Sequence, residues 1–245
     1  MAFHGIQQCY SKPDKWFSGI VTTDGRGAPA TMGEYKDFTP DEMVHVRADE
    51  QKKAAHMGDH GFLALLNWTS KEMRDPALST PTDELVALIE AARPEIIYTH
   101  NLCDKHPTHV GVAVRVVNAC RQLAPEAQPK AVWGCEVWRD LDWMVDSDKI
   151  LLDCTGRDNM QAALLGVFDS QVSGGKRYDL ATLGRRRAHA TYWESHEGDS
   201  AELLNFAMDL TPLVADPDLC FKSHVKGYMD RFYEDVAKLI GNVTG

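Results

Sequence analysis

Short apolar runs alternate along the chain with segments whose apolar residues recur at helical spacing. The runs at 16–23 (WFSGIVTT) and 62–68 (FLALLNW) are typical of buried strands. Between them, Pro40 follows Thr39 at a helix start, with acidic residues in the first turn. Further strands are predicted at 96–98, 131–138 and 149–154. Helices are predicted at 40–57, 81–92, 107–122, 160–171, 183–192 and 225–240.

This order of elements predicts an α/β fold. Strands that alternate with helices form a mostly parallel sheet with helices on its faces. The chain shows neither an internal repeat nor a low-complexity linker. A single domain over residues 1–245 is therefore expected.

Composition and charge narrow the classes of function. The net charge is −10, and the triplet Arg185–Arg187 is too short to outweigh it, so nucleic acid is not an expected partner. No apolar run approaches the roughly 20 residues of a membrane span. The N-terminus has no secretory pattern, and the six cysteines include no C-x-x-C pair. Reduced thiols and a cytoplasmic location are therefore expected.

The candidate chemistry follows the third predicted strand, where residues 99–109 read THNLCDKHPTH. In open α/β sheets, ligands bind at this end of the strands, beside helix N-termini. A proline at the first helical position makes His106 the N-cap, and His109 lies one turn further on the same rim. Asp104 is placed to hold the second nitrogen of a histidine. The pattern favours a metal site, and the alternative is that His106 only caps a helix while His109 is a surface histidine.

Three segments together resemble the PIG-L/LmbE-like family of zinc-dependent N-acetylglucosaminyl deacetylases. The segments are Val21-Thr-Thr-Asp-Gly25, Arg47-Ala-Asp-Glu50 with Ala54-Ala55, and Thr99-His-Asn101 with Asp104-Lys-His-Pro-Thr-His109. The resemblance implies a Rossmann-like three-layer sandwich. It also implies hydrolysis of the N-acetyl group of an N-acetylglucosamine-type sugar or glycoside, or of another small N-acyl sugar. A homo-oligomer is possible.

One family motif does not occur in this sequence. In the family, a His-Pro-Asp-Asp motif supplies two of the three metal ligands and the general base. Here Met1–Ile6 resembles the helix that follows that motif. The chain is therefore expected to lack the family's first strand, to be impaired in catalysis, and to retain no zinc through one histidine alone. The alternative is a catalytically inactive sugar-binding or scaffolding relative.

The resemblance also assigns roles to individual residues. His109 matches the family's metal ligand. His106 matches the histidine that stabilises the tetrahedral intermediate and protonates the leaving group. The family often has an aspartate where this chain has Thr108, so Asp104 is the expected partner in proton transfer.

Three residues outside this loop are expected to bind substrate. Arg47 matches an arginine of the family's pocket, and its alternative role is that of a solvated helix residue. Asp24 follows a strand and could hold sugar hydroxyls, or it could serve only as an Asp-Gly turn residue. His196 matches a late pocket residue by a looser alignment. A nucleotide-binding Rossmann enzyme is disfavoured, because no G-x-G-x-x-G follows a predicted strand.

Overall fold

A computed structural model describes residues 1–27 and 30–244 of the chain. Its contacts divide the chain into two compact units. Unit 1 comprises Met1, Arg74–Leu152 and the chain from Phe206 onward, and unit 2 comprises Ala2–Met73 and Asp153–Asn205. The single domain expected from the sequence stays a prediction.

Unit 2 contains a small parallel sheet and several helices. Its two strands, β1 (Phe17–Thr23) and β2 (His60–Trp68), pair with each other. The helices are α1 (Phe3–Cys9), α2 (Pro40–Met57), α3 (Ser70–Arg74, whose last residue falls in unit 1), α6 (Asp158–Gly166), α7 (Asp169–Val172) and α8 (Tyr178–Thr191). Phe3, Ala54, Met160 and Leu164 form an apolar core together with Cys154.

The start of α2 shows why the sequence predicts it well. The Thr39 hydroxyl accepts a hydrogen bond from the Glu42 backbone N–H at 3.2 Å. The Glu42 carboxylate in turn accepts the Thr39 backbone N–H at 2.8 Å. This capping box satisfies donors that the first turn of a helix leaves free, so the boundary is encoded locally.

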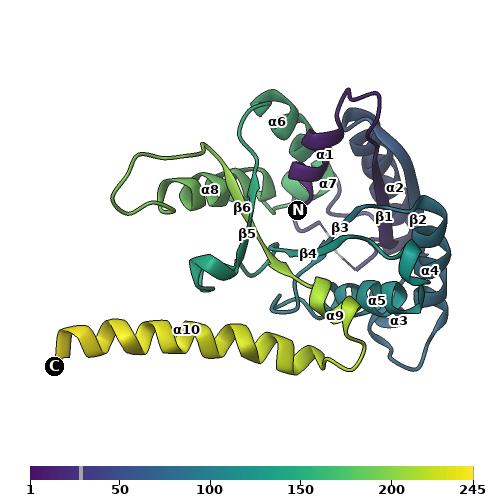
Figure 1. Cartoon of the computed structure of the whole chain (residues 1–245). Coiled ribbons are helices and arrows are strands. Elements are labelled where there is room, and N and C mark those ends of the chain that lie inside the picture. The colour runs from purple at the N-terminus through teal and green to yellow at the C-terminus, as the bar shows by residue number, and fades with distance from the viewer. Residues whose placement is uncertain (28–29, 245) are drawn as a thin grey trace. The chain divides into compact units, whose positions relative to one another are not determined.

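Unit 1 is built on a four-stranded sheet in the order β3-β4-β6-β5 (Figure 1). The strands are β3 (Ile96–His100), β4 (Ala131–Cys135), β5 (Lys149–Asp153) and β6 (Leu204–Asp209), with the ends of β5 and β6 crossing into unit 2. β3 and β4 are parallel, whereas β4 and β6 are antiparallel. The helices are α4 (Thr80–Ala92), α5 (Pro107–Gln122), α9 (Thr211–Ala215) and α10 (Phe221–Thr244), with short 3₁₀ turns η1 (Pro125–Ala127) and η2 (Asp146–Asp148).

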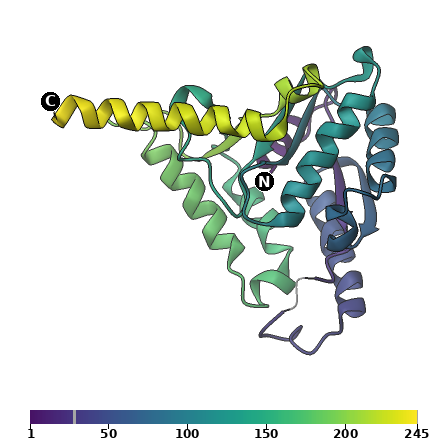
Figure 2. The ribbon, with the colours of Figure 1, turned by 90° about the horizontal axis from the view of Figure 1, so that it is seen from below.

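Helix α10 extends along unit 1 and ends well beyond α9 (Figure 2). The Tyr228 hydroxyl donates to the Asp209 carbonyl at 3.2 Å, and Arg231 pairs with Asp148 at 2.6 Å. Leu239 and Val243, nearer the end of the helix, are exposed. None of the described helices combines the length and the apolar character that a membrane crossing requires.

The α/β class predicted from the sequence is confirmed, and several details differ. The strand predicted at 131–138 ends at Cys135, because the buried Glu136 carboxylate accepts the Leu141 N–H at 3.1 Å and turns the chain. The helix predicted at 160–171 is two helices, because Ser170 N–H donates to Glu50 at 2.6 Å instead of continuing the helical pattern. The antiparallel strand β6 is not among the predicted elements.

The sequence predicts one sheet, whereas the strands of the described residues form two sheets. Within the described residues, β1 pairs only with β2, and β3 pairs only with β4.

Candidate metal-binding site

The loop between β3 and α5 is fixed by a buried asparagine. Asn101 follows the last residue of β3, and its side-chain amide donates to the Cys135 carbonyl at 3.0 Å. Its side-chain oxygen accepts the Cys103 N–H at 2.8 Å. A Cβ atom at Gly134 would lie 2.9 Å from the Asn101 Cα, so only glycine lets the two strand ends approach this closely. The loop therefore starts from a defined position at the end of the sheet.

Asp104 joins three segments of the loop region. Its Oδ1 accepts the His106 N–H at 2.8 Å, which fixes the turn into α5. Its Oδ2 accepts the Trp138 N–H at 3.1 Å and lies 3.3 Å from His109 Nδ1. Burial alone would raise the pKa of Asp104, but these three donors outweigh it and lower the pKa to about 2. The carboxylate is therefore charged throughout the neutral range.

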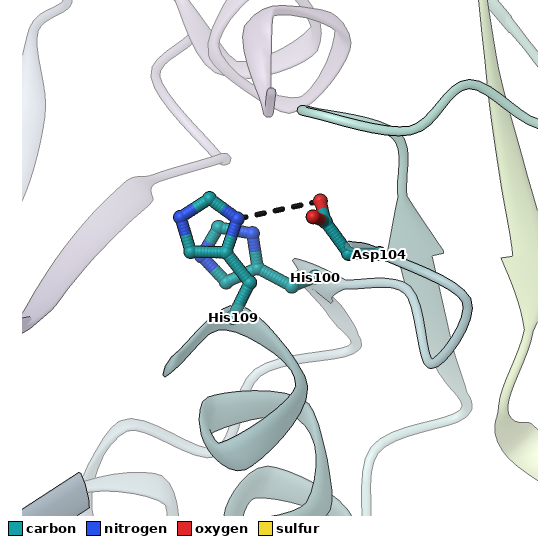
Figure 3. Close-up of side chains that lie close together, drawn as sticks. All are labelled: His100, Asp104 and His109. Carbon is teal, nitrogen blue, oxygen red and sulfur yellow. Dashed lines mark hydrogen bonds and ion pairs between the residues drawn. The ribbon is translucent and has the colours of Figure 1, made fainter. Parts of the chain in front are cut away.

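Three imidazole rings stack beside this carboxylate. The His100 and His109 rings are nearly parallel, with an interplanar angle of 8° and centroids 3.9 Å apart (Figure 3). The His106 ring stacks on His109 at 4.5 Å. Burial, and then the nearby His109, lower the pKa of His100 to about 3, and the same two causes lower the pKa of His106. His100 and His106 are therefore neutral near pH 7, the form that can bind a metal.

The sequence correctly placed His106 as the N-cap of α5, directly before Pro107. Its side chain, however, makes no capping hydrogen bond. Its Nδ1 is buried and has no hydrogen-bond partner within the described part of the chain. His106 is therefore the N-cap residue of α5, and its imidazole takes no part in the capping.

His100 is the site residue that sequence reasoning did not single out for a role. It is the last residue of β3, and strand alternation alone does not show which face of the sheet it joins. Its ring lies against His109, and its Nδ1 is buried without a hydrogen-bond partner among the described residues. The signal available in the sequence was its position at the carboxyl end of a parallel strand, where ligands bind.

His100, Asp104 and His109 have the composition of a metal site. One ligand atom from each of the three lies within 4.8 Å of the other two. Two imidazole nitrogens and a carboxylate oxygen suit zinc and other first-row divalent ions. The residues present therefore fit a metal ion, with the orphaned His100 Nδ1 as the atom that would gain a partner.

The residues predicted to bind substrate lie in unit 2. Asp24 is buried, accepts the Arg26 N–H at 3.1 Å, and forms an ion pair with Arg26 Nε at 2.5 Å. This is the bonding pattern of an Asp turn residue. A Cβ at the next residue, Gly25, would lie 2.7 Å from the Arg47 side chain, so Asp24 and Arg47 belong to one local cluster.

The cluster around Arg47 also contains buried polar groups. Arg47 Nη1 lies 3.9 Å from Glu50 Oε2, and the Glu50 carboxylate also accepts the N–H and the hydroxyl of Ser170. Arg47 is therefore a largely buried residue of unit 2 and not the solvated helix arginine that the sequence left as an alternative. His196 is exposed on the segment that follows α8. Substrate binding by these residues stays a prediction.

A family match covers the part of the chain that includes the histidine loop. Residues 1–120 match the model of PIG-L, GlcNAc-PI de-N-acetylase. These residues carry a PIG-L family sequence. The PIG-L match ends just before the end of α5, so it contains every residue of the stacked histidine cluster. No curated protein sequence matches the chain significantly.

Solved structures extend the likeness to most of the chain. The conserved protein TT1542 from Thermus thermophilus matches with a TM-score of 0.59 and 14% identity, covering 89% of this chain and 92% of that one. N,N'-diacetylchitobiose deacetylase from Pyrococcus horikoshii matches with a TM-score of 0.60 and 11% identity, covering 87% and 79%. GalB, the 4-carboxy-2-hydroxymuconate hydratase from Pseudomonas putida KT2440, matches with a TM-score of 0.61 and 13% identity, covering 85% and 89%.

These structures share the α/β fold of this chain. Their names include both a deacetylase and a hydratase. The fold therefore does not select one reaction, and the function has to be argued from the site.

Proposed function

We propose that this protein is a metal-dependent hydrolase that removes the acetyl group from an N-acetylated sugar. The PIG-L match over residues 1–120 supports the reaction class. The observation that carries the proposal is the stacked cluster of three imidazoles beside the charged carboxylate of Asp104. Such a cluster offers both metal ligands and a group that can transfer a proton.

A bound divalent metal would polarise the acetyl carbonyl and lower the pKa of an attacking water. His109 would hold the metal, and the Asp104 carboxylate lies beside it, with Oδ2 3.3 Å from His109 Nδ1. His106 stacks on His109 and is less than fully buried, so it can reach a substrate atom. In the proposed reaction, neutral His106 takes a proton from the attacking water as the water oxygen bonds to the acetyl carbon. His106 then donates that proton to the sugar nitrogen as the C–N bond breaks, which gives acetate and an amino sugar.

The low pKa of His106 suits this role. Its burial and the neighbouring imidazole His109 both disfavour the imidazolium. Once His106 has taken a proton from the attacking water, it therefore gives that proton up readily to the sugar nitrogen. Arg47, Asp24 and His196 are proposed to contribute to substrate binding, and a cytoplasmic location is proposed from the free cysteines.

Acetate release tests the proposal directly. The purified chain, supplied with Zn²⁺ or Co²⁺, is incubated with N-acetylglucosamine and with N,N'-diacetylchitobiose, and acetate is measured by an enzyme-coupled assay. We expect slow turnover, because the His-Pro-Asp-Asp motif is absent. EDTA should abolish this turnover, and His106→Ala should reduce it by about 100-fold or more. His45→Ala, at an exposed histidine of α2, is the matched control and should leave turnover unchanged.

The competing interpretation is an inactive sugar-binding relative. It predicts saturable binding of the same sugars by calorimetry, with no acetate released at any metal concentration. That result, obtained with folded and metal-supplemented protein, would overturn the proposed function.

A further inference from the structure

We infer that His100, Asp104 and His109 together form the protein ligand set of one divalent metal ion, contained within unit 1. This inference adds the metal ligands to the proposed function. It rests on the proposed function only for the role of the metal in catalysis. The family resemblance assigns a metal role only to His109 among these three. The structure adds His100 and Asp104, which come from the end of β3 and from the loop that follows it.

The ligand atoms are close to the spacing that a metal requires. Two ligands of a tetrahedral ion with bonds of about 2.0–2.2 Å lie roughly 3.4 Å apart. His109 Nδ1 and Asp104 Oδ2 are 3.3 Å apart and already have that spacing. Metal binding would replace the hydrogen bond between them and release the proton that it holds. The full set spans at most 4.8 Å, so the third ligand atom must move inward by about 1 Å.

The orientation of the rings indicates which atom moves. In Figure 3 the His100 and His109 rings lie one over the other, and each turns a nitrogen toward the Asp104 carboxylate. An imidazole lone pair lies in the ring plane, so two parallel rings cannot both direct a lone pair at one ion. A tilt of the His100 ring opens the stack and brings its nitrogen toward the other two ligand atoms.

This tilt breaks no hydrogen bond at the atom that moves. His100 Nδ1 is buried and makes no hydrogen bond to the described residues. An unpaired buried nitrogen is costly, and a metal bond would remove that cost. Asp104, by contrast, is held in place by the N–H groups of His106 and Trp138, as the carboxylate ligands of metal sites commonly are.

The charges also fit a divalent ion. Two neutral imidazoles and one carboxylate leave a bound M²⁺ with a net charge of +1 and, in a tetrahedral site, one open position for water. Because imidazole and carboxylate suit several first-row ions, Zn²⁺, Co²⁺, Fe²⁺ and Mn²⁺ are the candidate class. His106 stacks beside the set but is not required as a ligand.

Metal titration of the EDTA-treated full chain tests the ligand set without reference to turnover. Calorimetry with Zn²⁺ should give one site, and Co²⁺ should give the intense visible absorption of a tetrahedral complex. His100→Phe keeps the stacked ring and Asp104→Asn keeps the side-chain shape. Each should weaken Zn²⁺ binding by about 100-fold or more. His45→Ala should bind metal as the unaltered chain does.

His106→Phe separates this inference from the proposed function. It should still bind one metal ion while losing acetate release. If the unaltered chain binds metal through these residues but releases no acetate, the ligand set stands and the deacetylase proposal falls. If the unaltered chain binds no metal, or if His100→Phe and Asp104→Asn bind it with unchanged affinity, the ligand set is wrong.

A second measurement covers the case of variants that fail to fold. In the unaltered protein, the ¹³C shifts of the imidazole ring carbons distinguish a metal bound at Nδ1 from one bound at Nε2. We expect Nδ1 coordination at both His100 and His109. Coordination of His109 through Nε2, with Asp104 still bonded to its Nδ1, would overturn Asp104 as a ligand.

Discussion

Arg115 is expected to be a main stabilising residue of unit 1. It lies in α5 and is only 7% exposed. Its guanidinium donates to the carbonyls of Leu78 at 2.9 Å and Asp75 at 2.6 Å, and to the Thr82 hydroxyl at 2.8 Å. These bonds join the helix that carries His109 to the start of α4. Replacing Arg115 with Met keeps the apolar stem and removes all three bonds.

The size of the effect follows from two opposing contributions. Hydrogen bonds to a charged donor are worth about 1.5–3 kcal/mol each, and the acceptors left behind are partly buried. Against this, burying the guanidinium has a cost, and burial lowers the pKa of Arg115 accordingly. We expect Arg115→Met to lower the free energy of unfolding by about 3 kcal/mol. Arg115→Lys keeps the charge but lacks the planar fork, so it should lose about 1–2 kcal/mol.

Urea unfolding, followed by tryptophan fluorescence, measures these differences. A double-mutant cycle with Thr82→Val isolates one of the three bonds, and we expect a coupling of about 1 kcal/mol between the two sites. An Arg115→Met chain as stable as the unaltered one, together with zero coupling to Thr82, would refute the reasoning.

Two further predictions concern backbone strain and pH. Gly25 has a φ of +80°, and a Cβ there would lie 2.7 Å from the Arg47 Cγ. Gly25→Ala should therefore lower the free energy of unfolding by about 2 kcal/mol or more and lower the melting temperature. Gly184→Ala is the control, because a Cβ at Gly184 would meet nothing within 4 Å. It should be neutral or stabilising. Burial, and then Asp209, raise the pKa of Tyr228 to about 12. Because this folded-state pKa lies above the unfolded value near 10, the stabilisation is complete below about pH 10 and is lost between pH 10 and 12. Tyr228→Phe should reduce that loss in urea titrations across this range, and an unchanged pH profile would contradict the assignment.

Local signals explain how much of the fold the sequence predicts. The bounds of α5 match the prediction because Pro107 at the first helical position marks its start. The start of α2 matches because the Thr39–Glu42 capping box lies within four residues. By contrast, β6 is not predicted, because its run of buried residues at 204–208 has no periodicity that distinguishes a strand from a helix.

The candidate site, too, follows only in part from local signals in the sequence. The sequence places Asp104, His106 and His109 on one loop and one helix end, and it predicts that Asp104 holds a histidine nitrogen. The structure identifies that histidine as His109. It also adds the Trp138 N–H as a third donor to Asp104, across 34 positions of the chain.

By itself, the sequence determined the local order of strand, loop and helix, and thereby the set of side chains at the end of β3. It did so because capping, proline placement and apolar periodicity act over a few residues. Only the tertiary structure decided that His100 stacks on His109 and that both rings border a carboxylate held by the segment after β4. These contacts depend on how the strands pair and on which face each side chain occupies, and no short-range signal in the chain specifies them.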